Sequence, residues 1–397
     1  MKPLSQKYQT ITPSITLAIN AKAKAMKSEG KDVLSFASGE PDFNTPKHIR
    51  EKAIHQINQG GNGYTAAKGL KALREAIQHK LKHDNHLEYD VEDIIVSNGA
   101  KHSIFNALQA IINPTDEVIQ ISPYWVSYPE MIKMAGGVPI TLKTSKENAY
   151  IPTEDALKKV ITDQTKAIII NTPNNPTGMV YPKETLNMIG ALAVKHDFYI
   201  ISDEIYEKLI YEGTHHSIAS FTDELFERTI TINGLSKAYA MTGWRIGYAA
   251  APKMISAMMN AIQSHATSNP NTIAQHASIE GLKGDQTPIE SMRQSFEKRR
   301  QLMLSAIEKI PNISAIKPSG AFYVMFDIRY FKHKTINGKK IMSSTDFAEV
   351  LLDEAYIASV PGKAFGEDNL VRLSYATSEQ TIEKGMNRLH AFCEKYR

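Results

Sequence analysis

The chain has 397 residues, which is enough for one large domain or two and for a sizeable hydrophobic core. Hydrophobic residues make up 42% and charged residues 22% of the chain, which excludes a disordered or fibrous protein. The formal net charge of +4 comes from 46 basic and 42 acidic residues in mixed stretches, so it predicts neither a nucleic-acid nor a membrane partner. The single cysteine, Cys393, excludes an internal disulfide and a multi-cysteine metal site.

The N-terminal residues do not have the composition of an export signal. Lys2 and Lys7 precede the stretch ITPSITLAIN at 11–20, but polar residues interrupt this stretch repeatedly. No apolar run in the chain comes near the roughly 18 residues that a membrane-spanning helix needs. We therefore expect a soluble, cytoplasmic protein.

Apolar runs typical of buried strands alternate with helical patterns from about residue 90 to residue 250. The expected strands are 93–97, 116–122, 166–172, 199–203, 229–234 and 247–251, and the expected helices are 102–112, 126–135 and 183–196. This alternation predicts an α/β protein with a mainly parallel sheet covered on both faces. Ligands of such sheets bind beyond the carboxyl ends of the strands, so functional residues are expected there.

The pattern changes after residue 285. A long charged helix at 296–310 is followed by an expected strand at 319–328, a helix at 346–355, a strand at 371–376 and a terminal helix. We expect a large α/β domain at 46–285 and a smaller α+β domain made of 1–45 together with 286–397.

Two strand ends carry candidate catalytic residues. Asp203 and Tyr206 follow the strand 199–203 at a spacing of three, although Asp203 could instead cap a helix. Lys237 follows the strand 229–234, where partial burial would lower the pKa of its amine and make it a nucleophile toward carbonyls. The alternative for Lys237 is an ordinary solvated lysine.

Other segments are suited to anions. Residues 98–101 follow a strand and open a helix, whose free amides and positive end form a site for phosphate. Residues 171–178, NTPNNPTG, form a rigid polar turn or a plain loop. Arg372 alternates with apolar residues on its strand, where it could hold a carboxylate or simply face water. Gly39 lies in a tight turn that would let the backbone approach a ligand.

Eight motifs follow one another in an order that is known from one enzyme family. They are SGEPDF, GYTAAKGL, PYWVSYPEM, NTPNNPTG, SDEIY, SKAYAMTGWRIG, SGAFYV and VRLSYA. By these motifs the chain resembles, nearly end to end, the class I aminotransferases of the fold type I pyridoxal phosphate enzymes, in the bacterial aspartate aminotransferase branch. The resemblance implies a homodimer that transfers the amino group of L-aspartate to 2-oxoglutarate.

The resemblance also implies pyridoxal 5'-phosphate as the cofactor, with Lys237, Asp203 and Tyr206 as the catalytic residues. Lys237 would carry the cofactor as a Schiff base and, once released, would move the proton from the substrate Cα. Asp203 would keep the pyridinium nitrogen protonated, so that the ring acts as an electron sink. The other implied cofactor contacts are Tyr206 and Asn175 at the ring oxygen, Tyr124 stacked on the ring, and Gly99, Ala100, Lys101, Ser236, Arg245 and the partner subunit's Tyr64 at the phosphate.

The implied substrate site contains two cations. Arg372 would clamp the α-carboxylate, with Gly39, Trp125 and Asn175 around it, and Lys101 would reach the distal carboxylate of an acidic substrate. No metal site is predicted, because His79, His83 and His86 lack an accompanying ligand motif and are typical of surface histidines.

The chain departs from the family pattern at two positions. Many relatives have a phosphate-binding serine where this chain has Gly234, and members that also use prephenate often have a lysine at the position of Thr12, just before Pro13 and Ser14. The first departure weakens phosphate anchoring, and the second lowers the expectation of prephenate activity. An aspartate/prephenate or aromatic aminotransferase stays an alternative. From another class, Ser236 within GLSKA approaches the nucleophile turn of a serine hydrolase but lacks the final glycine.

Overall fold

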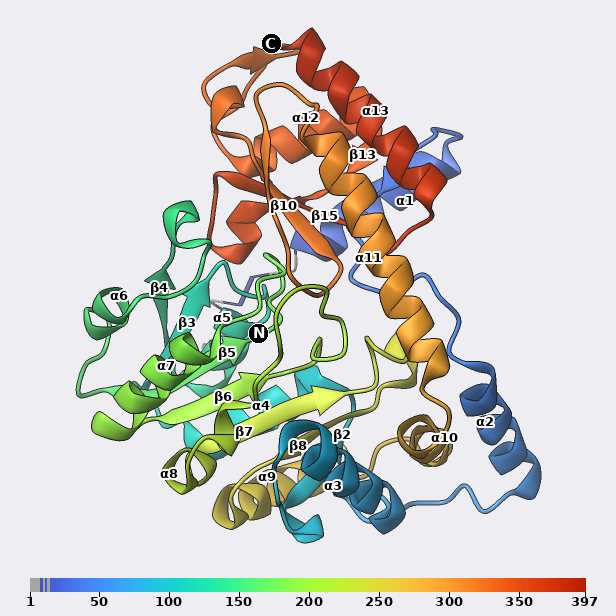
Figure 1. Cartoon of the computed structure of the whole chain (residues 1–397), viewed down its shortest axis with the longest axis vertical. Coiled ribbons are helices and arrows are strands. Elements are labelled where there is room, and N and C mark those ends of the chain that lie inside the picture. The colour runs from blue at the N-terminus through green and yellow to red at the C-terminus, as the bar shows by residue number, and fades with distance from the viewer. Residues whose placement is uncertain (1–7, 10, 13–14) are drawn as a thin grey trace, which may run out of the picture.

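The computed structural model describes residues 8, 9, 11, 12 and 15–397, so the predictions that involve Lys2, Lys7, Pro13 and Ser14 lie outside the described residues. Figure 1 shows a large mixed sheet in the lower half of the view and a smaller sheet in the upper half. The division into domains at residues 46 and 285 stays a prediction. Within the described residues, no helix combines the length and the apolar character needed to cross a bilayer.

The large sheet has seven strands in the order β2-β8-β7-β6-β5-β3-β4. They are β2 (Ile94–Ser97), β3 (Glu117–Ser122), β4 (Val138–Lys143), β5 (Thr165–Asn171), β6 (Tyr199–Asp203), β7 (Thr229–Gly234) and β8 (Gly247–Ala250). The predicted mainly parallel sheet is confirmed, since only β8 pairs antiparallel, with β2 and with β7. The connection from β7 to β8 contains no α-helix, so it lacks the crossover that parallel pairing requires.

Helices cover both faces of this sheet. Ile104 and Leu108 of α4 (Ala100–Ile111) pack with Ile169 of the sheet on one face, while Leu186 of α7 (Lys183–Lys195) packs with Ile168 on the other. The strands are therefore apolar on both sides, as expected for a buried parallel sheet. The other helices of this part are α2 (Lys47–Gln59), α3 (Lys71–Asn85), α5 (Tyr128–Ala135), α6 (Glu154–Lys158), α8 (Asp223–Phe226), α9 (Lys253–Ala266) and α10 (Thr272–Lys283).

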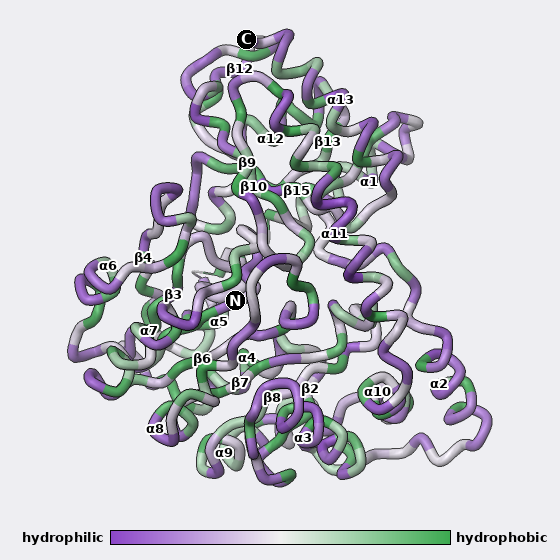
Figure 2. The backbone as a smooth tube through the Cα atoms, viewed as in Figure 1, coloured by the Kyte–Doolittle hydropathy of each residue, from purple (hydrophilic) through white to green (hydrophobic). Residues whose placement is uncertain are grey.

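The smaller sheet is antiparallel, in the order β14-β15-β10-β9. Its strands are β9 (Ser314–Ile316), β10 (Tyr323–Asp327), β14 (Val360–Pro361) and β15 (Leu370–Ser374), and its helices are α11 (Thr287–Ile307), α12 (Ser344–Ala355) and α13 (Glu379–Lys395). Figure 2 shows hydrophilic and hydrophobic residues alternating along α13, whose buried side includes Ile382 and Leu389. Two-stranded pairs complete this part: β1 (Leu34–Ser35) with β13 (Ile357–Ala358), and β11 (Thr335–Ile336) with β12 (Lys339–Lys340). The N-terminal helix α1 (Ile15–Ser28) lies beside β13.

Candidate active site

A pocket of ≈ 520 Å³ lies at the carboxyl ends of β5, β6 and β7. Asn171 ends β5, Asp203 ends β6, and Ser236 and Lys237 follow β7, and all four side chains line the pocket. The start of α4 and Arg372 of β15 complete its wall. The pocket therefore lies between the two sheets, at the sheet edge where the strand pattern predicts a ligand site.

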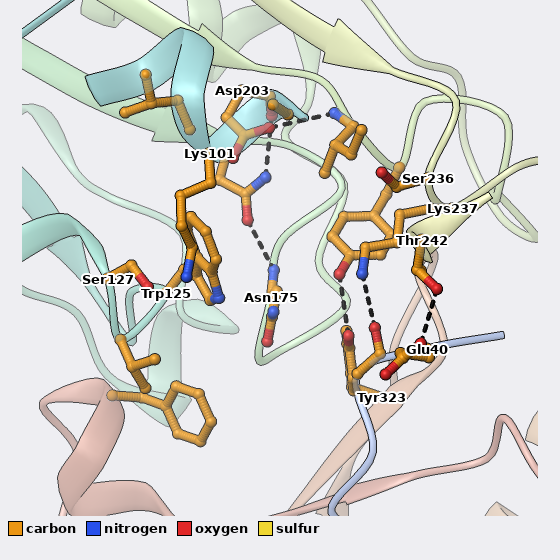
Figure 3. Close-up of a pocket in the computed structure, with 18 of the residues that line it drawn as sticks. Glu40, Lys101, Trp125, Ser127, Asn175, Asp203, Ser236, Lys237, Thr242 and Tyr323 are labelled. Carbon is orange, nitrogen blue, oxygen red and sulfur yellow. Dashed lines mark hydrogen bonds between the residues drawn. The ribbon is translucent and has the colours of Figure 1, made fainter. Parts of the chain in front are cut away.

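Lys237 projects into this pocket from the segment after β7 (Figure 3). Its Nζ donates a hydrogen bond to the Gly39 carbonyl oxygen at 2.6 Å and lies 5.9 Å from the centroid of the Tyr206 ring. Burial lowers the pKa of Lys237 to about 8, although the nearby charge of Glu40 opposes this shift. The neutral fraction of the amine near physiological pH is thus far larger than for an ordinary lysine, and the neutral amine is the form that attacks a carbonyl carbon.

Asp203 lines the same pocket and is 4% exposed. Burial raises the pKa of Asp203 to about 6, although its Oδ2 accepts a hydrogen bond from the Tyr128 hydroxyl at 2.6 Å. A turn follows β6 rather than a helix, so the alternative of a helix cap is wrong. The Tyr206 hydroxyl shares a hydrogen bond of 2.9 Å with the Tyr323 hydroxyl at the same pocket.

The start of α4 forms a cradle suited to an anion. The helix begins after Gly99, whose φ of 85° lies in the left-handed region and which offers no side chain to cap the helix. A Cβ at Gly99 would lie 2.4 Å from Nη2 of Arg245, so only glycine lets this guanidinium lie against the backbone. Arg245 donates to the carbonyl oxygens of Thr242 and Asn98. Together with the Ser236 hydroxyl, these groups form the donor set that phosphate requires.

Arg372 is a buried cation, 3% exposed, on the interior strand β15. Its Nη1 donates to Asn175 Oδ1 at 2.8 Å and its Nη2 donates to the Ala37 carbonyl oxygen at 3.1 Å, whereas its buried Nε has no hydrogen-bond partner. Burial lowers the pKa of Arg372. The alternative of a solvated edge-strand arginine is therefore wrong, and the unpaired Nε indicates a site for an anion.

Lys101 and Trp125 form the opposite wall of the pocket from Lys237 (Figure 3). The Lys101 ammonium lies 4.8 Å from the centroid of the Trp125 ring, a distance typical of a cation–π contact. Burial and the charge of Arg245 lower the pKa of Lys101. The pocket thus contains a second cation besides Arg372, which could bind a second anionic group.

Three of the predicted site residues do not line the pocket in this chain. Gly99 lies behind the Arg245 guanidinium. Tyr124 donates its backbone N–H to the Phe365 carbonyl oxygen and packs beside Gly366, so its neighbour Trp125 supplies the aromatic wall instead. Tyr64 is 95% exposed, so its predicted role in a partner subunit stays a prediction.

The pocket also contains residues that sequence reasoning missed. Among them are Glu40, Asn171, Thr242 and Tyr323, and Glu40 Oε2 accepts a 2.7 Å hydrogen bond from the Thr242 hydroxyl. These four residues lie within the motifs noted above, so their motif membership was the available signal. The Gly234 departure also has a physical reason, since a Cβ there would lie 2.9 Å from the Gly247 Cα and the Ile246 oxygen.

A second group of charged residues lies near the end of β6 but outside the pocket, and it consists of Lys80, Glu204, Glu207 and His215. The Lys80 ammonium pairs with Glu207, and His215 Nε2 lies 2.9 Å from Glu204 Oε2. Ligand atoms of Glu204, Glu207 and His215 lie within 4.8 Å of one another, as in a metal site. However, Asn85 donates to both carboxylates and Ser217 donates to Glu204, so hydrogen bonds already engage these oxygens.

Comparisons with known proteins agree with this architecture. Residues 31–389 match the family model of aminotransferase class I and II. The chain is 48% identical over 390 residues to the aspartate aminotransferase of Bacillus sp. (strain YM-2) and 44% identical over 391 residues to the aspartate/prephenate aminotransferase of Thermus thermophilus, covering 98% of both chains in each case. The structure of Thermus thermophilus aspartate aminotransferase with maleate superposes with a TM-score of 0.93 at 43% identity, covering 99% of this chain and 100% of the other.

The chain therefore belongs to the class I and II aminotransferases and has the α/β fold type I of that family. It is a pyridoxal phosphate-dependent aminotransferase, homologous to aspartate aminotransferases. The fold class and the enzyme class predicted from the motifs are thereby confirmed.

Proposed function

We propose that this enzyme is an aspartate aminotransferase, which reversibly transfers the amino group of L-aspartate to 2-oxoglutarate and yields oxaloacetate and L-glutamate. The observation that carries the proposal is the pair of pocket cations, Arg372 and Lys101, because a dicarboxylic substrate supplies one carboxylate to each. The aspartate aminotransferase names of its relatives support the proposal. So does the Thermus thermophilus structure, which contains the dicarboxylate maleate.

The residues of the pocket fit pyridoxal phosphate. The cradle at the start of α4, with Arg245 and Ser236, would hold the phosphate, and Asp203 would hold the ring nitrogen. Asn175, Tyr206 and Trp125 would hold the ring. When bound, the cofactor supplies an aldehyde that takes up the amino group and a ring that withdraws electrons from the substrate.

Four residues of the chain have the other roles in the proposed reaction. The Lys237 amine, with its pKa lowered to about 8, is the base that moves the proton from the substrate Cα. The Asp203 carboxylate keeps a proton on the ring nitrogen. Arg372 orients the α-carboxylate, and Lys101 selects an acidic side chain.

Two alternatives carry less support. Aspartate/prephenate aminotransferases are among the relatives, but Thr12 has no ammonium to offer and its hydroxyl donates to Glu130 at 2.9 Å. A serine hydrolase would need a base beside Ser236, and no histidine occurs among the described residues that line the pocket.

We also propose that the enzyme acts as a homodimer. The side chain of Tyr64 is 95% exposed and that of Met254 is 87% exposed. Because its own chain leaves the Tyr64 side chain uncovered, this side chain is free to reach the pocket of a second subunit. In the dimer, the partner's Tyr64 would contact the phosphate.

The test of the substrate assignment is Lys101→Ala, assayed at saturating pyridoxal phosphate with aspartate, phenylalanine and alanine. A lost charge-assisted contact lowers kcat/KM for aspartate by about tenfold to 100-fold, while the rates for phenylalanine and alanine are spared. Lys133→Ala is the matched control, because Lys133 pairs with Glu130 outside the pocket. An equal loss on all three amino acids would refute Lys101 as the selector of acidic substrates.

A further inference from the structure

Asp203 receives a hydrogen bond from a residue with no assigned role. Tyr128, the first residue of α5, is 2% exposed, and its hydroxyl lies 2.6 Å from Asp203 Oδ2. The two residues are 75 positions apart in the chain, so the bond joins α5 to the end of β6. The distance is that of a short hydrogen bond from a hydroxyl to an ionised carboxylate.

Few groups stabilise the charge of Asp203. Besides Tyr128, the hydrogen-bond donor that the structure gives to its carboxylate is the Ile205 backbone N–H, at 3.3 Å from Oδ1. Burial, and to a smaller degree the Glu204 charge, oppose ionisation and raise the pKa of Asp203, whereas the charge of Lys237 favours ionisation. The Tyr128 bond is the closer of the two contacts, so it contributes strongly to keeping Asp203 anionic.

Tyr128 is itself held firmly. Its ring lies edge-on against the Trp125 ring, with centroids 5.4 Å apart, and its backbone N–H donates to the Trp125 carbonyl oxygen at 3.0 Å. Burial raises the pKa of the Tyr128 hydroxyl well above its usual value. The hydroxyl therefore stays protonated and remains a donor at any pH at which the enzyme works.

We propose that Tyr128 is a positioning residue for Asp203, whose carboxylate it keeps ionised and correctly oriented to accept the ring N–H of the cofactor. This inference rests on the proposed use of pyridoxal phosphate. If Tyr128 had a purely structural role, its hydroxyl would stabilise the fold, and its loss would not change how cofactor binding depends on pH.

The experiment measures the affinity of the apo-protein for pyridoxal phosphate between pH 5.5 and pH 8, by equilibrium dialysis, for the wild type and Tyr128→Phe. Loss of the charge-assisted bond shifts the pH midpoint of binding upward by about one unit and weakens binding at pH 6 by about tenfold. Tyr375→Phe is the matched control, because Tyr375 is also fully buried but donates to the Ala321 carbonyl oxygen at 3.2 Å. It should leave the pH midpoint unchanged.

A double variant makes the test independent of stability. In Asp203→Asn there is no carboxylate to ionise, so adding Tyr128→Phe should not shift the pH profile further. A Tyr128→Phe profile that coincides with the wild-type profile overturns the inference, as does an equal shift in Tyr375→Phe. A wild-type protein that does not bind pyridoxal phosphate at all contradicts the proposed function instead, so the two failures are distinguishable.

Discussion

Two regions rich in charged side chains lie near the end of β6, and in each of them part of the charge is buried: Arg372 in the pocket, and Lys80 and Glu204 in the cluster. In the pocket, Lys237, Arg245 and Arg372 donate to backbone or amide oxygens, and Lys101 lies over a tryptophan ring. None of these four cations forms an ion pair with a carboxylate of the described residues. In the cluster, Lys80 pairs with Glu207, and His215 lies beside Glu204.

The difference distinguishes a binding site from a structural cluster. Charges removed from water are costly unless an opposite charge is close. In the cluster, burial disfavours both charged forms, but the charges of Lys80, His215 and Lys208 together lower the pKa of Glu207 to about 2. In the same way, the hydrogen bond and charge of Glu204 and the charge of Glu207 together raise the pKa of His215 despite its burial. In the pocket, burial lowers the pKa values of Lys237, Lys101 and Arg372. The pocket cations are therefore placed for anions that arrive with cofactor and substrate.

The largest expected effect on stability is a contrast between two buried cations. Lys80→Met leaves Glu207 buried without its partner and should lower the free energy of unfolding of the apo-protein by about 3–5 kcal/mol. Arg372→Met removes a buried cation that has no carboxylate partner, so the same quantity should stay unchanged or rise. Urea unfolding of both variants measures the contrast, and equal destabilisation would remove the distinction between the two regions.

Activity should show the opposite contrast. Arg372→Met removes the proposed partner of the α-carboxylate, so kcat/KM should fall about 30-fold or more for every amino acid tested. Arg300→Met is the control, since Arg300 is also 3% exposed but pairs with Glu212, and neither residue lines the pocket. Its kcat/KM should change little. A loss in Arg372→Met that is confined to one substrate would contradict the assignment.

The pH dependence of apo-protein stability gives a smaller effect. Because the pKa of Lys237 is about 8 in the folded protein and 10.5 ordinarily, the folded form releases a proton between these pH values that the unfolded form retains. The free energy of unfolding should thus rise by roughly 2–3 kcal/mol between pH 8 and pH 10.5. Lys237→Met should lack this rise. Urea unfolding of both proteins at pH 7.5 and at pH 10 measures this change. If the free energy of unfolding changes equally with pH in the wild type and in Lys237→Met, the pKa of Lys237 is not lowered in the folded protein.

The sequence was sufficient for the parts that depend on local pattern. The six strands expected between about residues 90 and 250 occur, and the ends of two of them carry Asp203 and the segment with Lys237. The apolar pattern of a strand and the polar residues at its end are local properties, so the sequence alone shows them. The edge strand β4 was missed because Val138–Lys143 contains Pro139 and is mostly half-exposed, which hides the apolar run. The side-chain orientation of Tyr124 relative to Trp125 also depends on a backbone conformation that no pattern fixes.

Contacts between residues that are far apart in the chain could not be predicted from local sequence patterns. Arg372 and Asn175 meet although 197 positions separate them, and the Tyr128 bond to Asp203 spans 75 positions. Lys80 and Glu207 have the sequence context of ordinary surface charges, and only the packing of α3 against the turn after β6 buries them. The sequence indicated that Arg372 and Asn175 belong to one site only through the resemblance of its motifs to those of a known family.

Reduction of the bound cofactor onto the protein tests the proposed attachment of the cofactor to Lys237. The purified protein is incubated with pyridoxal phosphate, reduced with borohydride, digested, and mapped by mass spectrometry. We expect an absorption band beyond the aromatic region before reduction and a phosphopyridoxyl group on Lys237 afterwards, with neither Lys101 nor Lys80 modified. A protein that stays colourless, or a label distributed over other lysines with Lys237 unmodified, would contradict the proposed attachment.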